Sequence, residues 1–313
     1  MEDPMKAVQF NEYGDASVLK VVDAEKPSAG AGQVLVDVAA VSLNPFDTKL
    51  RDGVMKDGIP LTLPITIGGD IAGIVSEIGN GVSNFAVGDK VYGQANSVAG
   101  DSGAFAEFAA TKANHIAQVP SNLTLEEAAS LPLIGVSAIQ AIHDHLELKS
   151  GQKLFIHGGG GGIGSIAIQI AKSLGAYVTT TASGSDVDYV RSLGADEVID
   201  YATNDYAEAL SSYDAAFDTV GDDFNKMIGI LARGGKAVSM VAAADEARAS
   251  ELGVTAQTQG TQVTTEKLDT LRLLVESSVV TVRIGKVFPL EHVIDAFQAR
   301  EAGEKGKVVV TLL

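Results

Sequence analysis

The sequence predicts an α/β protein of two domains, one an antiparallel, barrel-like β-domain and the other built on a doubly wound parallel sheet. Three observations predict this fold class. The chain has 313 residues, more than one hydrophobic core usually holds. Its first third consists of short strand-like runs separated by turns, and its middle alternates strands with helices. With 46% hydrophobic and 20% charged residues, the composition is that of an ordered globular protein.

The first predicted domain contains strand-like runs separated by Gly, Asn, Asp and Pro clusters. These strands follow one another too closely for helical crossovers, so an antiparallel arrangement is expected. The runs cover residues 6–10, 33–43, 70–79, 90–95, 103–111 and 115–120.

The second predicted domain begins near residue 123, where helical spacing starts and Thr124 followed by Glu127 forms a capping-box pattern. The helical spacing continues to residue 146, and strands then alternate with helices over short connections, which is typical of βαβ units and a parallel sheet. Strands are expected at residues 153–158, 176–182, 197–201, 214–220 and 236–242, and helices at residues 164–174, 187–193 and 224–232.

The last part of the chain continues the alternation, but its pattern does not show which domain it joins. Strand-like runs are expected at residues 254–260, 280–288 and 307–313, and helices at residues 266–277 and 290–300. From pattern alone, these segments either extend the parallel sheet or return to the first domain.

Charge and cysteine content restrict the function. Forty acidic and 23 basic residues give a net charge of −17, which disfavours binding to nucleic acid and to anionic membranes. The absence of cysteine excludes disulfides, thiol nucleophiles and thiolate-bound metals. The chain starts with acidic residues where a signal peptide needs basic ones, and it contains no apolar run of about 18 residues. The expected compartment is the cytoplasm.

A glycine-rich turn is the strongest local motif. The segment GQKLFIHGGGGGIGSIAIQIAKSLGAYV contains a strand, then Gly159, Gly161 and Gly164 at GxGxxG spacing, then an amphipathic helix and a second strand. In this context Gly159 is expected to form the tight turn, Gly161 to let a pyrophosphate approach, and Gly164 to pack the helix on the strand. The helix N-terminus would then face the phosphates. The segment predicts a bound dinucleotide, and the alternative, a flexible linker, is disfavoured by the apolar flanks.

The end of the second strand, residues 179–184, indicates which dinucleotide is bound. A carboxylate that would bind the ribose 2′-OH of NAD is missing until Asp186. The neutral, hydroxyl-rich edge favours NADPH, although no Arg or Lys follows closely to pair with its 2′-phosphate. The alternative is that these are ordinary exposed residues at a strand end.

Several longer motifs resemble the quinone oxidoreductase (zeta-crystallin-like) branch of the zinc-independent medium-chain dehydrogenases/reductases, and the resemblance covers nearly the whole chain. It implies a GroES-like β-barrel-type catalytic domain, residues 1–122 and 265–313, with an inserted Rossmann doubly wound nucleotide-binding domain, residues 123–264. It also implies a dimer formed through the edge strand at residues 254–260. The motifs are NPFD at residues 44–47, PITIGGDIAGIVSEIG at 64–79, GDKVYG at 88–93, AASLPLIGVSAIQAI at 128–142, RSLGADEVIDY at 191–201 and the terminal GKVVVTL.

By the same resemblance, thirteen residues are candidates for binding NADPH. Ser137 replaces a threonine that reaches the cofactor, Ser183 and Tyr201 surround the 2′-phosphate, and two loops line the nicotinamide side. The candidates are Ser137, Gly159, Gly161, Gly162, Ile163, Gly164, Ser183, Gly184, Tyr201, Thr219, Val220, Val241 and Ala242.

Zinc-dependent relatives carry a cysteine three residues before an aspartate and a histidine in a Gly-His-Glu segment. The equivalents here are Asn44 before Asp47, and Gly69 before Asp70, so that zinc site cannot form and no metal is expected. His143 and His145, two residues apart, do not share a helix face and are interpreted as exposed helix residues. His157 is expected at a strand end beside the glycine turn.

Without zinc to stabilise an alkoxide, the chemistry favoured is NADPH-dependent reduction of electron-poor acceptors, namely quinones or α,β-unsaturated carbonyl compounds. Asn44 and Asp47 are the candidate catalytic residues. Asn44 is expected to donate a hydrogen bond to the developing oxyanion, or else to be a turn residue before Pro45. Asp47 is expected to be a structural hydrogen-bond acceptor. One alternative function is a non-catalytic NADPH-binding redox sensor, since fold does not fix function; another, RNA binding, is disfavoured by the charge.

Overall fold

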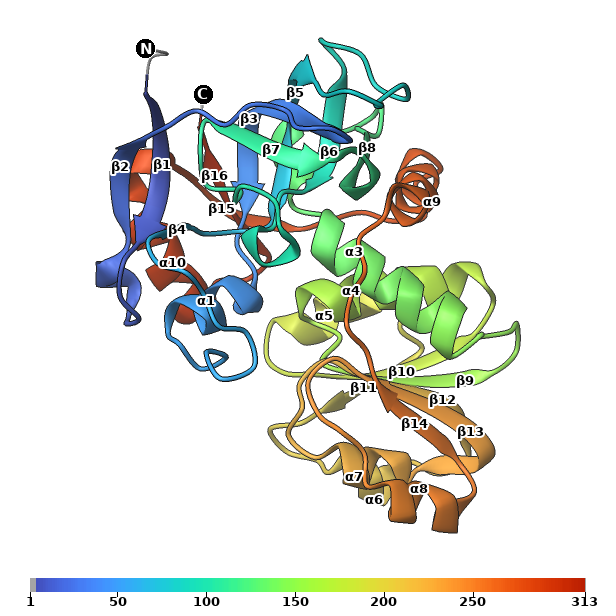
Figure 1. Ribbon diagram of the computed structural model, residues 1–313. Coiled ribbons are helices and arrows are strands. Elements are labelled where there is room, and N and C mark those ends of the chain that lie inside the picture. Colours follow the sequence, from blue (N-terminus) through green and yellow to red (C-terminus); the bar gives the residue numbers. More distant parts are fainter. Residues whose placement is uncertain (1–3, 313) are drawn as a thin grey trace. The chain divides into compact units, whose positions relative to one another are not determined.

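The chain divides into two units, each with its own β-sheet structure. The computed structural model describes residues 4–312 (Figure 1). Within these residues the first unit comprises residues 4–133, 263–276 and 282–312, and the second comprises residues 134–262 and 277–281. The domain boundaries drawn from the sequence, at residues 123 and 265, stay a prediction.

The first unit is built on two β-sheets. A seven-stranded sheet has the order β15-β16-β3-β5-β6-β8, with β7 also paired to β3, and a three-stranded sheet has the order β2-β1-β4. All pairs are antiparallel except the parallel pair β15 and β16. The strands are β1 (Met5–Phe10), β2 (Lys20–Ala24), β3 (Gln33–Ser42), β4 (Ile65–Thr66), β5 (Asp70–Ile78), β6 (Lys90–Gln94), β7 (Phe108–Lys112), β8 (Ile116–Gln118), β15 (Ile284–Pro289) and β16 (Lys307–Thr311).

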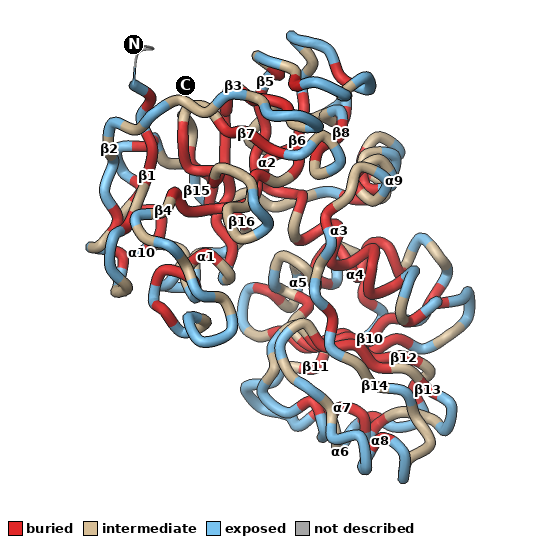
Figure 2. Tube along the Cα trace, viewed as in Figure 1, coloured by how far each residue is buried: buried red, intermediate tan, exposed pale blue. Residues whose placement is uncertain are grey.

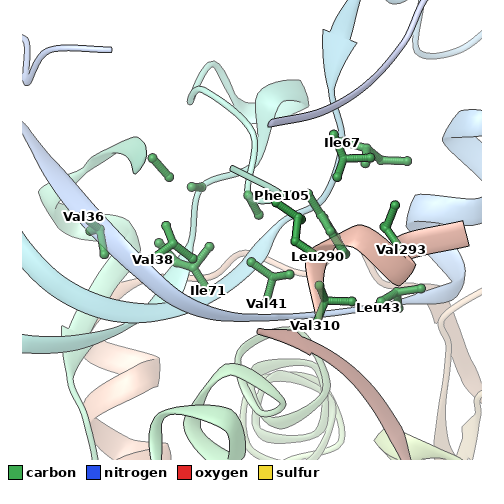
Figure 3. Packing of buried hydrophobic residues seen from close by; sticks show 14 of the residues in the cluster. Val36, Val38, Val41, Leu43, Ile67, Ile71, Phe105, Leu290, Val293 and Val310 are labelled. Carbon is green, nitrogen blue, oxygen red and sulfur yellow. The ribbon is translucent and has the colours of Figure 1, made fainter. Parts of the chain in front are cut away.

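The core of the first unit lies against β3, whose sequence VLVDVAAVS is almost uniformly apolar because the strand is covered on both faces. Figure 3 shows the packing of Val36, Val38 and Val41 of β3 with side chains from other elements, including Phe105. Phe105 also packs against Phe297 of α10 (Val293–Glu301), with ring centroids 5.8 Å apart.

Within the described residues, four α-helices belong wholly to the first unit. α2 (Leu125–Ala129) begins with the predicted capping box, in which the Thr124 main-chain N–H donates to Glu127 (2.9 Å) and the Glu127 N–H to the Thr124 hydroxyl (3.3 Å). α9 (Thr265–Glu276) contacts β8, and α10 contacts β15 and β16. The question that the sequence pattern left open has a divided answer: the strand expected at residues 254–260 extends the parallel sheet, whereas the later strands and helices return to the first unit.

The fourth helix, α1 (Pro45–Arg51), was not expected from the sequence. Asn44 occupies its N-cap and Pro45 its first position, where proline loses nothing by lacking an N–H. The expectation of a simple turn at Asn44 and Pro45 is therefore wrong. Strands β2 and β4 are likewise additional, and β7 begins only at Phe108 instead of residue 103.

The second unit contains a six-stranded parallel sheet, as predicted, in the order β11-β10-β9-β12-β13-β14. Figure 2 shows that its central strands β9, β10 and β12 are largely buried. The strands are β9 (Lys153–His157), β10 (Tyr177–Ala182), β11 (Glu197–Asp200), β12 (Tyr213–Asp218), β13 (Leu231–Ser239) and β14 (Thr255–Thr258).

The helices of the second unit differ from the prediction in three ways. The helical stretch expected at residues 123–146 divides into α2, then α3 (Pro132–Ile139), which begins at a proline, and a π-helical turn (Gln140–His145). α7 (Phe224–Ile228) ends four residues before the expected residue 232, because β13 already begins at Leu231. α6 (Tyr206–Ala209) and α8 (Glu246–Leu252) are too short for periodicity to show. α4 (Gly162–Ser173) and α5 (Asp186–Ser192) lie near their expected positions.

Candidate functional site

The glycine-rich turn joins β9 to α4 in the second unit. Gly158 has φ 92°, so the left-handed conformation of the turn is at this residue and not at Gly159. Gly159 is required for a different reason: a Cβ there would lie 2.2 Å from the Thr180 hydroxyl of β10. We predicted that Gly159 forms the tight turn, but the positive φ of the turn is at Gly158. Gly159 instead allows the turn to pack closely on the next strand, β10.

The space around Gly164 is tightly packed, whereas the space around Gly161 is open. A Cβ at Gly164 would lie 2.2 Å from the Gly158 carbonyl oxygen, so α4 packs closely on the turn, as expected. A Cβ at Gly161 would meet only that same oxygen, at 3.4 Å. Gly161 is the N-cap of α4, and the first N–H groups of an α-helix lack partners within the helix. The open side of Gly161 and the following N–H groups fit a pyrophosphate.

A buried histidine holds the turn against β10. His157 Nδ1 lies 2.8 Å from Thr181 Oγ1, and this hydroxyl accepts the Gly158 N–H at 2.9 Å. His157 Nε2 lies 3.0 Å from Asp222 Oδ1. His157 is therefore at a strand end beside the turn, as predicted. Its contacts fix both the turn and the loop after β12.

The loops after β12 and β13, which contain four candidate residues, are fixed by one buried pair. Asp218 Oδ1 accepts the N–H groups of Val220 (3.0 Å) and Gly221 (2.9 Å), and its Oδ2 accepts the Ser239 hydroxyl at 2.7 Å. Ser239 Oγ in turn accepts the N–H groups of Val241 (3.1 Å) and Ala242 (2.9 Å). Sequence reasoning missed Asp218 and Ser239, although each is the last residue of a parallel strand.

The remaining candidates of the second unit lie at several depths. Thr219 donates to the His157 carbonyl oxygen at 2.7 Å, while Val220 and Val241 are about half exposed. Ser137 is fully buried, and its hydroxyl lies 2.7 Å from that of Thr261. Tyr201 is 60% exposed.

A second polar cluster lies in the first unit, at neighbouring ends of β3, β5, β6 and β16. Asn44 Nδ2 donates to Asp70 Oδ2 at 2.9 Å, and Asn44 Oδ1 accepts from Lys307 Nζ at 2.6 Å. Asp70 also accepts from Gln94 Nε2 at 2.8 Å and from the Leu133 N–H at 3.1 Å. We call Asn44, Asp47, Asp70 and Lys307 the buried polar cluster, because each is at most 6% exposed.

Burial dominates the protonation of this cluster. It raises the pKa of Asp47 to about 7, opposed by the hydrogen bond from the Asn44 N–H. It also raises the pKa of Asp70, an effect opposed most strongly by the charge of Lys307. Burial lowers the pKa of Lys307 to about 8, against the attraction of both carboxylates. Asp47 Oδ2 accepts the Asn44 main-chain N–H at 2.8 Å, the acceptor role expected for it.

Comparison with known proteins identifies the family. Residues 30–121 match the family model "Alcohol dehydrogenase GroES-like domain" and residues 193–310 match "Zinc-binding dehydrogenase". The chain is 33% identical over 322 residues to an NADPH-dependent alkenal/one oxidoreductase of Arabidopsis thaliana, covering 98% of this chain and 79% of the relative. The structure of the quinone oxidoreductase from Coxiella burnetii is 34% identical, with a TM-score of 0.91 and 99% of both chains covered. The chain belongs to the quinone oxidoreductase family of medium-chain dehydrogenases/reductases.

A further solved relative of this quinone oxidoreductase family member contains a cofactor. A mycobacterial protein complexed with NADPH is 30% identical to the chain, with a TM-score of 0.87, covering 98% of this chain and 100% of the other. The parallel sheet and the GroES-like unit predicted from the sequence are confirmed by these similarities.

The donor set of this family member does not fit the zinc named in one of its family models. Gly69 has no ligating side chain, and the side-chain oxygen Oδ1 of Asn44 accepts a hydrogen bond from the Lys307 ammonium, which would repel a metal cation. In residues 4–312 no three His, Asp or Glu side chains are grouped to hold a metal ion. His143 is exposed, as predicted, and His145 is half-buried.

The end of β10 in this chain has an acidic neighbour. The Asp186 side chain is buried, and a Cβ on Gly160 of the turn would lie 3.1 Å from Asp186 Oδ2. Ser183 is half-buried, and Gly184 and Ser185 are exposed. A carboxylate beside the glycine turn would repel a 2′-phosphate, and residues 183–186 contain no Arg or Lys to offset that repulsion.

Proposed function

We propose that this protein is an NADPH-dependent oxidoreductase that reduces quinones or α,β-unsaturated carbonyl compounds. The observation that carries the proposal is the glycine turn, whose open side at Gly161 fits a pyrophosphate, in a chain similar over its full length to quinone and alkenal/one oxidoreductases. When bound, NADPH supplies a hydride to an electron-poor acceptor.

The residues proposed to hold NADPH are the thirteen candidates named from the sequence. The first turn of α4, Gly162 to Gly164, would bind the pyrophosphate through main-chain N–H groups. Gly159 and Gly161 would let it approach, since their own N–H groups donate to the carbonyl oxygens of Thr181 and Gly158. Thr219 to Val220 and Val241 to Ala242 would border the nicotinamide, because the Asp218–Ser239 pair fixes both loops. Ser183, Gly184 and Tyr201 would surround the 2′-phosphate. Ser137 would contact the cofactor from a buried position, where its hydroxyl lies against that of Thr261.

Asn44 is the proposed catalytic hydrogen-bond donor. In the described part of the chain, Asn44 Nδ2 makes one hydrogen bond, to Asp70, and an amide nitrogen carries two hydrogens. The second N–H is proposed to donate to the carbonyl oxygen of the acceptor as negative charge develops on it. Asp47 would support this role by fixing the Asn44 main chain.

The test is reduction of an acceptor panel, followed as loss of the reduced nicotinamide absorbance. Phenanthrenequinone and a small enone should accelerate NADPH oxidation, and NADPH should react faster than NADH under the same conditions. Asn44→Ala should lower kcat without changing the affinity for NADPH. A wild-type protein that binds NADPH but reduces no quinone or enone would refute the proposal. That result would favour the redox sensor, which the names of the relatives do not support.

We propose two further properties, an oligomeric state and a compartment. We propose a homodimer formed through β14, because within residues 4–312 this strand pairs only with β13 and leaves one edge of the sheet unpaired. Light scattering on the purified protein measures this directly. We also retain the cytoplasm as the proposed compartment. No helix within residues 4–312 is long and apolar enough to cross a membrane.

A further inference from the structure

Lys307, the first residue of β16, is buried without a direct part in the proposed reaction. Its side chain is 6% exposed, although lysine is rarely buried unless it is paired. Its Nζ donates to the Leu43 carbonyl oxygen at 2.8 Å and to Asn44 Oδ1 at 2.6 Å. Both acceptors lie where β3 ends and α1 begins, beside the β3–β16 pairing. The ammonium is therefore directed at the residue proposed to donate to the acceptor.

We propose that Lys307 is a positioning residue, which fixes the side-chain amide of Asn44 so that its second N–H is held ready for a carbonyl oxygen. This inference rests on the proposed function, since it concerns how Asn44 performs its part in that reaction.

The argument begins with hydrogen-bonding capacity. An ammonium only donates, and an ionised carboxylate only accepts. Asn44 lies between the two, so its Oδ1 must face Lys307 and its Nδ2 must face Asp70, as the distances of 2.6 and 2.9 Å show. The two charged neighbours determine the orientation of the amide, and with it the direction of the remaining N–H.

Lys307 also keeps Asp70 an acceptor. Burial raises the pKa of Asp70, and the charge of Lys307 is the strongest effect that lowers it. Without the ammonium, Asp70 would take up a proton more readily and could then donate to Asn44 Oδ1. The amide would lose its partner at one end and its fixed orientation at the other.

The experiment compares Lys307→Met with Lys307→Gln and with a matched control, Lys286→Met. Lys286 lies on β15 and is paired on the surface with Glu304. Lys307→Met should lower kcat by roughly tenfold or more, about the loss of one hydrogen bond to a charged group. The Kd for NADPH should stay within about threefold. Lys307→Gln keeps a donor and should recover part of kcat, whereas Lys286→Met should behave as wild type.

A double-mutant cycle separates positioning from an independent effect. If Lys307 acts through Asn44, the double variant Asn44→Ala/Lys307→Met should be no slower than Asn44→Ala alone. Multiplying effects, or an unchanged kcat in a folded Lys307→Met variant, would overturn the inference. If Lys307→Met does not fold, the same comparisons are made with Lys307→Gln, whose equality with wild type in both kcat and amide exchange would also overturn it.

A measurement that needs no turnover distinguishes this inference from the proposed function. The side-chain amide protons of Asn44, assigned by their absence from the NMR spectrum of Asn44→Ala, should exchange with solvent about tenfold faster in Lys307→Met. Unchanged exchange would refute the positioning role. If exchange accelerates while the wild-type protein reduces no quinone or enone, the proposed function fails and the positioning of Asn44 stands.

Discussion

Replacing Gly161 by alanine should weaken NADPH binding while leaving the fold nearly intact. Gly161 has φ −77° and ψ 168°, an extended conformation open to any residue, and the added Cβ would meet only one protein atom, at 3.4 Å. Alanine is a poorer N-cap than glycine, and the expected loss of stability is about 1 kcal/mol or less.

The loss on the cofactor side should be larger. A methyl group on the open side of Gly161 would displace the pyrophosphate from at least one main-chain N–H. A hydrogen bond to a charged group contributes about 1.5–3 kcal/mol, and every 1.4 kcal/mol is roughly tenfold in Kd. The Kd for NADPH should therefore rise by a factor of roughly 10 to 150. Nucleotide fluorescence titration measures the affinity, and thermal unfolding of the unliganded protein measures stability.

Two other glycines serve as controls. Gly164→Ala should reduce both affinity and stability, because its Cβ would lie 2.2 Å from the Gly158 carbonyl oxygen. Gly58→Ala should change neither, since the nearest atom would be 3.9 Å away. A Gly161→Ala variant that binds NADPH as tightly as wild type would show that the pyrophosphate does not pass this residue, and the reasoning about the turn would be wrong.

Three further substitutions test other parts of the chain. Ser239→Ala leaves the Val241 and Ala242 N–H groups and one Asp218 oxygen without their partner. It should lower the free energy of unfolding by about 1–3 kcal/mol and weaken NADPH binding, whereas the exposed Ser250→Ala should do neither; equal Tm values for both would refute this. Asp47→Asn tests the carboxyl group whose pKa burial raises to about 7. A raised carboxyl pKa contributes stability that is full below the unfolded-state pKa, near 4, and lost as pH rises through 7. The stability of Asp47→Asn relative to wild type should therefore be greater at pH 8 than at pH 5 by about 2–3 kcal/mol, and a difference that does not change with pH in denaturant titrations would contradict it. Ser185→Arg adds a cation at an exposed position where the Ser185 side chain makes no capping hydrogen bond. It should lower the KM for NADPH by about tenfold and leave that for NADH unchanged, and equal changes for both nucleotides would show that this position does not face the 2′-phosphate.

The parts of the fold that could be predicted from the sequence are those determined by residues close to one another in the chain. Alternating strands and helices predicted the parallel sheet, and the capping box at Thr124 predicted the start of α2. Short elements were not predicted, because a helix such as α6, with four residues, is too short to show a helical period. The glycine turn was predicted, but the reason for Gly159 depends on Thr180, a residue of the next strand. Spacing within a motif cannot show such a contact.

The residues that hold the candidate sites in place were harder to predict, because each acts through a partner that is distant in the sequence. His157, Asp218 and Ser239 end strands of the parallel sheet, and carboxyl ends of parallel strands share one edge. Polar residues at those positions were therefore a signal that could have been used. The partners of each could not be inferred, since they depend on strand order.

The buried polar cluster shows most clearly that contacts between residues distant in the sequence could not be predicted. Asn44 and Lys307 are separated by 263 positions, and they meet because β3 and β16 pair with a register that no local pattern encodes. The lysine lies in a motif read from the sequence only as the start of the terminal strand. The fold places the ammonium of Lys307 against Asn44, near the carboxyl groups of Asp47 and Asp70. Removing Lys307 would leave Arg300 as the cation that acts on Asp47, and it would raise the pKa of the buried Asp70 further.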